Sequence, residues 1–143
     1  MKTPVRPTAQ IRCGEVYLMN FGDDAHEQHG LRPGVVLQNN VGNLHSPNII
    51  ALPLTTSLKK LNMPTHVLLR AEDTGLMYDS MVLAECPKCI AKGFIGAYLT
   101  TIPDHMMREI ATAHLAATAA AAYLDVAGLL NAREQAIRLN AIA

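Results

Sequence analysis

The stretch GLRPGVVLQNN, residues 30–40, decides the fold class and poses the question of function. Its aliphatic centre, bounded by turn residues, predicts a buried strand over residues 34–40. Arg32 stands just before that strand, between an apolar residue and a proline. An arginine in this position is either a charge that covers the end of a strand or a group that a rigid sheet holds out for chemistry. The remaining sequence has to distinguish these two interpretations.

The bulk composition indicates one domain with a hydrophobic core. The chain has 143 residues, of which 50% are hydrophobic, and its formal net charge is zero. Zero charge argues against a general nucleic-acid coat but leaves room for a local basic groove. No apolar run reaches the roughly 18 residues of a membrane span, and residues 1–10 read as a flexible lead rather than a secretion signal. With three cysteines and no such signal, we expect reduced thiols, a cytoplasmic location and no membrane partner.

Short apolar stretches separated by turn residues fill the chain from Glu15 to Thr101. Strands of this length and spacing predict a mainly β fold, either a small barrel or a strongly curled sheet. Pro53 lies inside one of the stretches, and a proline there predicts an edge or a bulge. The expected strands cover residues 15–20, 34–40, 47–54, 64–69, 81–85 and 94–100, with a turn at 41–46.

The character of the chain changes after Ile102, where a helix is predicted. Pro103 is suited to a first helical turn, and Thr101 or Ile102 could act as the cap. Apolar residues recur at helical spacing from Met106 onward. The tail, residues 116–143, is alanine-rich and helical in propensity. Its apolar faces point to self-association.

Within this tail, Gly128 is expected to break the helix. A second amphipathic stretch is expected to run from Leu129 to Leu139. The tail could add helical surface to a dimer or build a larger oligomer.

Four segments together resemble the MazF/PemK family of toxin endoribonucleases. They are RCGEVYLMNFG (12–22), HEQHGLRPGVVLQNN (26–40), SPNIIALPLTTSLKKLNMPTHVLL (46–69) and MVLAE (81–85). The resemblance runs in order from about Ile11 to Ala113. It implies an SH3-like small β-barrel followed by a C-terminal helix over residues 11–115, working as a homodimer. Residues 116–143 have no counterpart in the resemblance and form a helical extension.

The resemblance also implies an activity, namely cleavage of single-stranded RNA at a short sequence, without metal or cofactor and inhibited by a cognate antitoxin protein. The catalytic arginine and threonine of the family fall on Arg32 and Thr55, and its acidic residue at the RNA groove falls on Glu85. Many relatives have a glutamine and then an arginine where this chain has Cys86 and Lys88. This departure bears on the recognised RNA sequence more than on the chemistry.

These residue types suit RNA cleavage because RNA carries its own nucleophile, the 2′-OH. Its attack on the adjacent phosphate gives a 2′,3′-cyclic phosphate and a 5′-OH. A guanidinium pairs with two phosphate oxygens at once, so Arg32 is expected to stabilise the developing charge. The hydroxyl of Thr55 can orient the 2′-OH or a phosphate oxygen, although Thr56 is equally suitable by spacing alone. The sequence does not identify the general base. His26 and His29, in the loop before Arg32, are candidates, but solvated loop histidines are commoner.

Candidate RNA contacts lie on either side of this pair. Asn39 and Asn40 could offer amide edges to unpaired bases, or they could simply end a strand and enter a turn. Lys59 and Lys60, in the loop after Thr55, could hold backbone phosphates. Glu85 and Lys88 complete the predicted set, and His66 is expected to pack at the start of a strand.

The segment CPKC, residues 86–89, resembles half of a zinc or redox motif. It lacks a second pair of ligands and the helical context of a thioredoxin motif. We therefore expect Cys86 and Cys89 to be reduced thiols in a loop, with no metal.

Two other functions compete with the nuclease. The fold also resembles that of the CcdB-type gyrase inhibitors, which poison a protein target and need no Arg32 and Thr55 pair. A catalytically inactive barrel kept as an interaction module is the third interpretation, favoured by the neutral charge and the altered segment after Glu85. The retained R-P and P-L-T motifs favour the nuclease.

Overall fold

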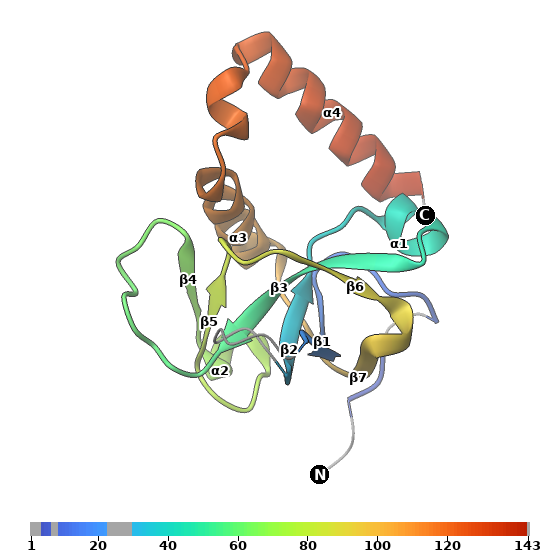
Figure 1. Ribbon diagram of the computed structural model, residues 1–143, viewed down its shortest axis with the longest axis vertical. Helices are drawn as coiled ribbons and strands as arrows, with labels where there is room; N and C mark the ends of the chain where they lie inside the picture. Colours follow the sequence, from blue (N-terminus) through green and yellow to red (C-terminus); the bar gives the residue numbers. More distant parts are fainter. Residues whose placement is uncertain (1–3, 7–8, 23–29, 143) are drawn as a thin grey trace.

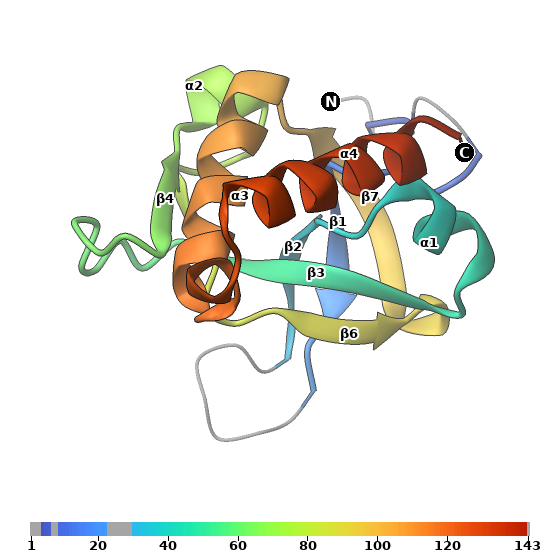
Figure 2. The same cartoon turned by 90° about the horizontal axis from the view of Figure 1, so that it is seen from above.

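The computed structural model describes residues 4–6, 9–22 and 30–142. A curled sheet forms the body, and helices α3 and α4 lie on one side of it (Figures 1 and 2). The strands are β1 (Glu15–Asn20), β2 (Leu31–Val36), β3 (Asn48–Thr55), β4 (His66–Leu69), β5 (Ser80–Leu83), β6 (Lys88–Ala91) and β7 (Ile95–Thr101). The α-helices are α1 (Asn40–His45), α2 (Ala71–Thr74), α3 (Asp104–Ala117) and α4 (Val126–Ile142), and two 3₁₀ turns, η1 (Lys92–Phe94) and η2 (Ala120–Tyr123), complete the described elements.

The sheet has the strand order β4-β5-β3-β2-β1-β7, with β6 added on β3. The strand pairings of the described residues are antiparallel, as expected for short strands joined by turns. The predicted fold class, mainly β with C-terminal helices, is confirmed. The barrel is not closed, because β4 and β7 end the described sheet without pairing to each other.

The local predictions for residues 34–46 and for the segment around Cys89 were wrong. The expected turn at residues 41–46 is helix α1, which the Asn39 side chain caps by accepting a hydrogen bond from the Gly42 N–H at 2.9 Å. The expected strand over 34–40 therefore ends at Val36. The expected loop around Cys89 is strand β6, whose register pairs Ile90 with Ile49 in the core. With only four residues, KCIA, this strand is too short to show the alternation of apolar and polar residues that is typical of a strand.

Pro53 lies at a break between two partner strands. On one side of β3, residues 48–51 pair with β6, whereas residues 54–55 pair with β5. Pro53 stands between these two groups and pairs only with Gly34 of β2. Proline has no N–H to donate to a neighbouring strand, and Pro53 lies where β6 ends and β5 begins as the partner of β3. The predicted edge position is therefore a local one, within a central strand.

Helix α3 covers one of two hydrophobic clusters in the sheet. Its buried residues Met106, Ile110 and Ala113 pack on side chains from β1 to β5. Pro103 itself is the N-cap residue and provides no side-chain cap, so the expected cap at Thr101 or Ile102 was wrong. The second cluster comprises Tyr17, Met19, Phe21, Val36, Ile49, Ala51 and Ile90.

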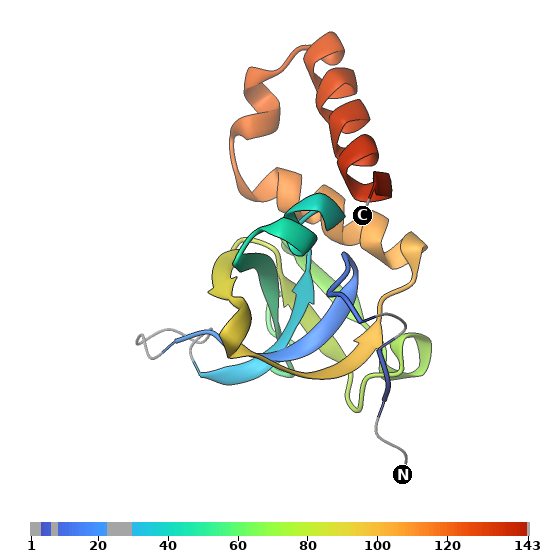
Figure 3. The same ribbon diagram turned by 90° about the vertical axis from the view of Figure 1, so that its right-hand side faces the viewer.

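The C-terminal segment forms an arch of α3, η2 and α4 (Figures 1 and 3). Gly128 does not break a helix. It lies in the first turn of α4, where its N–H donates to the Asp125 carboxylate at 2.7 Å. The far end of α4 is held on α1 by the pair Asn40 and Asn140. None of the described helices combines the length and apolar character needed to cross a bilayer.

Candidate active site

The sheet places Arg32 and Thr55 on two neighbouring strands, β2 and β3. Gly34 pairs with Pro53 and Val35 with Leu52 across β2 and β3. Arg32 lies two residues before Gly34, near the start of β2, and Thr55 lies two residues after Pro53, at the end of β3. Both residues therefore stand at the same end of this strand pair.

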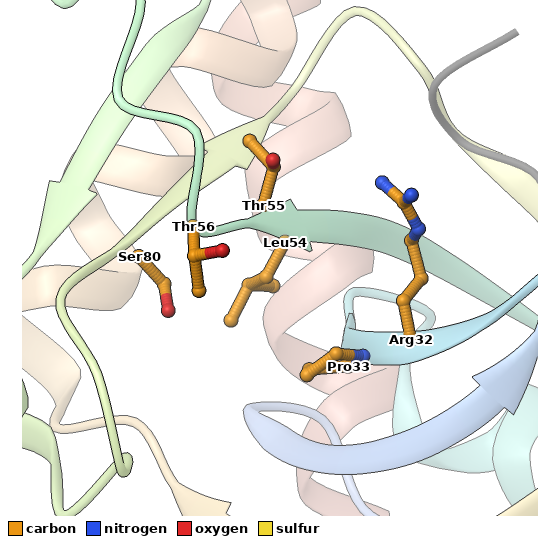
Figure 4. A pocket seen from close by; sticks show the side chains of 6 residues that line it. All are labelled: Arg32, Pro33, Leu54, Thr55, Thr56 and Ser80. Atoms are coloured by element: carbon orange, nitrogen blue, oxygen red, sulfur yellow. The ribbon is translucent and has the colours of Figure 1, made fainter.

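A cavity of about 160 Å³ opens at this pair. Figure 4 shows the Arg32 and Thr55 side chains extending in the same direction from their two strands. The Nε atom of Arg32 is buried and has no hydrogen-bond partner within the described residues. A buried donor without an acceptor costs roughly 1–3 kcal/mol. The cavity is lined by Arg32, Pro33, Leu54, Thr55, Thr56 and Ser80.

Thr55 and Thr56 differ in setting, although both line the cavity. Thr55 is half-buried, and its hydroxyl accepts a hydrogen bond from the Ser57 N–H at 3.1 Å, which leaves the hydroxyl proton available for a ligand. Thr56 is exposed and follows the end of the strand. Ser80 was not predicted, because a serine at the start of a short strand carries no distinguishing signal. It is 6% exposed and donates to the Tyr78 carbonyl at 3.0 Å.

The loop after Thr55 and the end of β5 are joined by a histidine. Lys59 and Lys60 are exposed in this loop. His66 contacts the Lys60 carbonyl through Nδ1 at 2.9 Å and the Glu85 carboxylate through Nε2 at 2.7 Å. From the sequence, only packing was expected of His66. The structure instead connects two groups of predicted RNA contacts through its ring.

The two asparagines have structural contacts. Asn39 caps α1. Asn40 is 6% exposed, and its side-chain carbonyl oxygen accepts from the Cys13 N–H at 2.8 Å and from the Asn43 side chain at 3.1 Å. Its amide nitrogen donates to the Asn140 carbonyl at 3.1 Å. Because this amide is buried and bonded at both ends, the base contact expected of Asn40 is corrected to a structural role.

Lys88 belongs to a second cavity, of about 430 Å³, and its Nζ donates to the Phe21 carbonyl at 3.0 Å. It therefore does not line the cavity of Arg32 and Thr55. The second cavity is lined by Asn20, Phe21, Gly22, Asn48, Lys88, Cys89, Ile90, Ala91 and Phe94.

The other reactive side chains of the described residues include three cysteine thiols and the buried phenol of Tyr17. Cys13, Cys86 and Cys89, all within the described residues, form no disulfide. Burial raises the pKa of the Cys13 thiol to about 11, whereas Cys89 is exposed. Burial, followed by the hydrogen bond to Glu15, raises the pKa of Tyr17 well above its usual range. No group of three or more His, Cys, Asp or Glu residues that could hold a metal occurs in the described part of the chain. His26 and His29 lie outside it.

Comparison with known proteins identifies the family. A family model described as PemK-like, MazF-like toxin of type II toxin–antitoxin system matches residues 12–116, including the whole sheet and most of α3. The chain belongs to this family. The predicted resemblance is therefore confirmed.

Within the PemK/MazF family, one relative is the protein named Endoribonuclease MazF from Staphylococcus saprophyticus. It is 35% identical over 101 residues, which cover 70% of this chain and 84% of that protein. Among solved structures, an endoribonuclease from a mycobacterial species in complex with its cognate antitoxin has a TM-score of 0.63 and 27% identity, covering 75% of this chain and 93% of that chain. MazF from Deinococcus radiodurans has a TM-score of 0.64 and 25% identity, covering 75% and 94% respectively.

The family match ends at residue 116, near the end of α3. Helix α4 therefore lies beyond the part of the chain that defines a PemK/MazF toxin. Arg32 and Thr55 stand on β2 and β3, within the matched part, so their position is set by the sheet rather than by this helix.

Proposed function

We propose that the protein is the toxin of a type II toxin–antitoxin module and acts as an endoribonuclease. It cleaves single-stranded RNA at a short sequence, without a metal ion, leaving a 2′,3′-cyclic phosphate and a 5′-OH. The observation that carries this proposal is the buried Arg32 Nε, without a partner among the described residues, in a cavity shared with Thr55. A phosphate would supply the acceptor that this donor lacks.

Arg32 stabilises the charge that develops on the phosphate as the 2′-oxygen attacks. Its guanidinium remains protonated, so it acts through electrostatics and hydrogen bonding rather than as a base. One of its N–H groups can also donate a hydrogen bond to the leaving 5′-oxygen, which stabilises the charge on that oxygen. A preorganised donor of this kind contributes roughly 10²–10³ in rate, or about 3–4 kcal/mol. The strand pairing of β2 contributes by fixing the backbone of Arg32 before the substrate arrives.

Thr55 orients the reacting groups. Since the Ser57 N–H already occupies one lone pair of the Thr55 hydroxyl, its proton is directed to another acceptor, here a phosphate oxygen or the 2′-oxygen. Single strands are required because an A-form helix holds the 2′-oxygen out of line with the leaving oxygen. Unpaired bases are also free for recognition.

The partners follow from the same reasoning. Lys59 and Lys60 hold backbone phosphates, and Glu85, which His66 holds beside their loop, contacts the RNA in the same groove. Lys88 lines the second cavity and supplies a further positive charge for RNA there. A relative at 27% identity is described as an endoribonuclease in complex with its cognate antitoxin. We infer that this chain likewise binds a cognate antitoxin, and we propose that the antitoxin inhibits it. We also propose that the protein works as a homodimer.

The test uses purified wild type, Arg32→Ala and Arg32→Lys on a long RNA with open loops, in excess EDTA. Wild type should give discrete cuts that end in cyclic phosphate, and the Arg32→Ala variant should be slower by roughly 10²–10³. Arg32→Lys should recover little, because an ammonium lacks the planar fork. Thr55→Val and Thr56→Val form a matched pair, in which the first should lose far more of kcat.

Two results would contradict the proposal. If cutting requires an added divalent ion, the protein is a nuclease but the proposed independence from metal is wrong. If folded wild type does not cut at all, a gyrase assay would test the protein-poison alternative, and its failure would leave the inactive interaction module.

A further inference from the structure

His66 connects two segments that the proposed function assigns to RNA binding. It begins β4, and its side chain is 7% exposed. One ring nitrogen, Nδ1, lies 2.9 Å from the Lys60 carbonyl in the loop that follows Thr55. The other, Nε2, lies 2.7 Å from the Glu85 carboxylate just beyond β5. The ring therefore spans the gap between the lysine loop and the acidic residue.

Both partners of the ring carry oxygen atoms that accept hydrogen bonds, namely the Lys60 backbone carbonyl and the Glu85 carboxylate. The Glu85 side chain is 34% exposed, so it is held at the surface by a ring that is itself almost fully buried.

The loop end of this contact is under backbone strain. Lys60 has φ of 57°, a left-handed conformation that costs a residue with a side chain about 1 kcal/mol or more. Its carbonyl also accepts from the Met63 N–H at 3.1 Å, which closes a turn. The hydrogen bond from His66 adds a second restraint on the same carbonyl. The direction in which Lys59 and Lys60 leave the backbone therefore depends on His66.

We propose that His66 is a positioning residue for RNA binding. Its ring holds the Lys60 backbone and the Glu85 carboxylate in one fixed arrangement, so that the RNA contacts of the lysine loop and of Glu85 are made together. This inference rests on the proposed function, and His66 does not itself touch the reacting atoms. Removal of the ring weakens RNA binding and leaves the chemical step at Arg32 and Thr55 in place.

Two substitutions separate the two contacts. In His66→Asn the side-chain amide nitrogen can take the place of Nδ1, which keeps the bond to Lys60 and gives up the bond to Glu85. In His66→Gln it can take the place of Nε2, which keeps the bond to Glu85 and frees the loop. His66→Ala removes both bonds, and His105→Asn, on the exposed side of α3, is the matched control.

The readouts are KM, kcat, cleavage sequence and the dependence of binding on salt, all measured on one short single-stranded RNA. His66→Ala should raise KM at least about tenfold, the size expected for removing a charge-assisted hydrogen bond. Its kcat should stay within about twofold of wild type. His66→Gln should flatten the salt dependence by about 0.7 in slope for each phosphate that the lysines no longer hold. His66→Asn should keep that slope and relax the cleavage sequence.

The proposal is overturned if folded His66→Ala keeps the wild-type KM, cleavage sequence and salt slope. It is also overturned if the defect in all three His66 variants falls on kcat alone, which would make His66 part of the chemical step. These results differ from failure of the proposed function, in which wild type itself would neither bind nor cut the RNA. Melting temperatures of the variants distinguish loss of positioning from loss of fold.

Discussion

Replacing Asn40 with alanine should destabilise the protein without removing a contact to RNA. Its side chain joins three parts of the chain, namely the segment before β1 through Cys13, helix α1 through Asn43, and helix α4 through Asn140. Alanine deletes all three hydrogen bonds and leaves the buried donors and the helix carbonyl without their partner. The change therefore tests whether this asparagine is structural or reads a base.

The magnitude follows from the number of bonds. Each intramolecular hydrogen bond contributes about 0.5–1.5 kcal/mol, and stranding buried groups moves the sum toward the upper end. Three bonds give a loss of about 2–4 kcal/mol in the free energy of unfolding. At an unfolding entropy of about 2.1 cal/mol/K per residue, a chain of this length should lose about 7–13 °C in Tm. Asn140→Ala removes only the acceptor for the Asn40 N–H and should cost about 1 kcal/mol.

The assay combines thermal unfolding by circular dichroism with RNA affinity measured well below the Tm of each variant. We expect Asn40→Ala to show the large drop in Tm and to bind RNA with wild-type affinity while folded. Asn40→Asp is a second variant, since it keeps the acceptor but turns an oxygen toward the Asn140 carbonyl. An unchanged Tm together with abolished RNA affinity in Asn40→Ala would refute the structural assignment and restore the base contact.

Three further predictions concern a strand, the thiols and the tail. Gly34→Ala should destabilise the protein by about 1–3 kcal/mol in urea unfolding, because an added Cβ would lie 2.8 Å from a buried aromatic ring; an unchanged midpoint would contradict this. Iodoacetamide at pH 8 should label exposed Cys89 readily and Cys13 slowly, since burial raises the pKa of the Cys13 thiol to about 11, and mass spectrometry after proteolysis would show the order. In α4, Leu130 is 62% and Ile137 51% exposed, so Leu130→Gln with Ile137→Gln should lower the assembly mass measured by light scattering, and an unchanged mass would refute self-association through this helix.

Local sequence patterns predicted much of the sheet and the first long helix. Short apolar runs bounded by turn residues predicted β1, β3, β5 and β7 to within one or two residues. The residues of α3 that recur at helical spacing are the ones it buries. The sequence did not predict α1 or β6, because each is too short for its period to stand out from its polar neighbours. The prediction that Gly128 breaks a helix was also wrong. A glycine is tolerated in the first turn of a helix, and here the Asp125 carboxylate accepts a hydrogen bond from its N–H.

The sequence by itself determined the family, the fold class and the identity of Arg32 and Thr55 as a candidate pair, because these are properties of residues in order along the chain. It could not decide how side chains far apart in that order share their hydrogen bonds. Only the tertiary structure turned Asn40 from an expected base contact into a buried link to Asn140, and only it placed the ring of His66 between Lys60 and Glu85. Amide and imidazole groups make strong bonds with many partners, so their role is set by which partner the fold brings within about 3 Å.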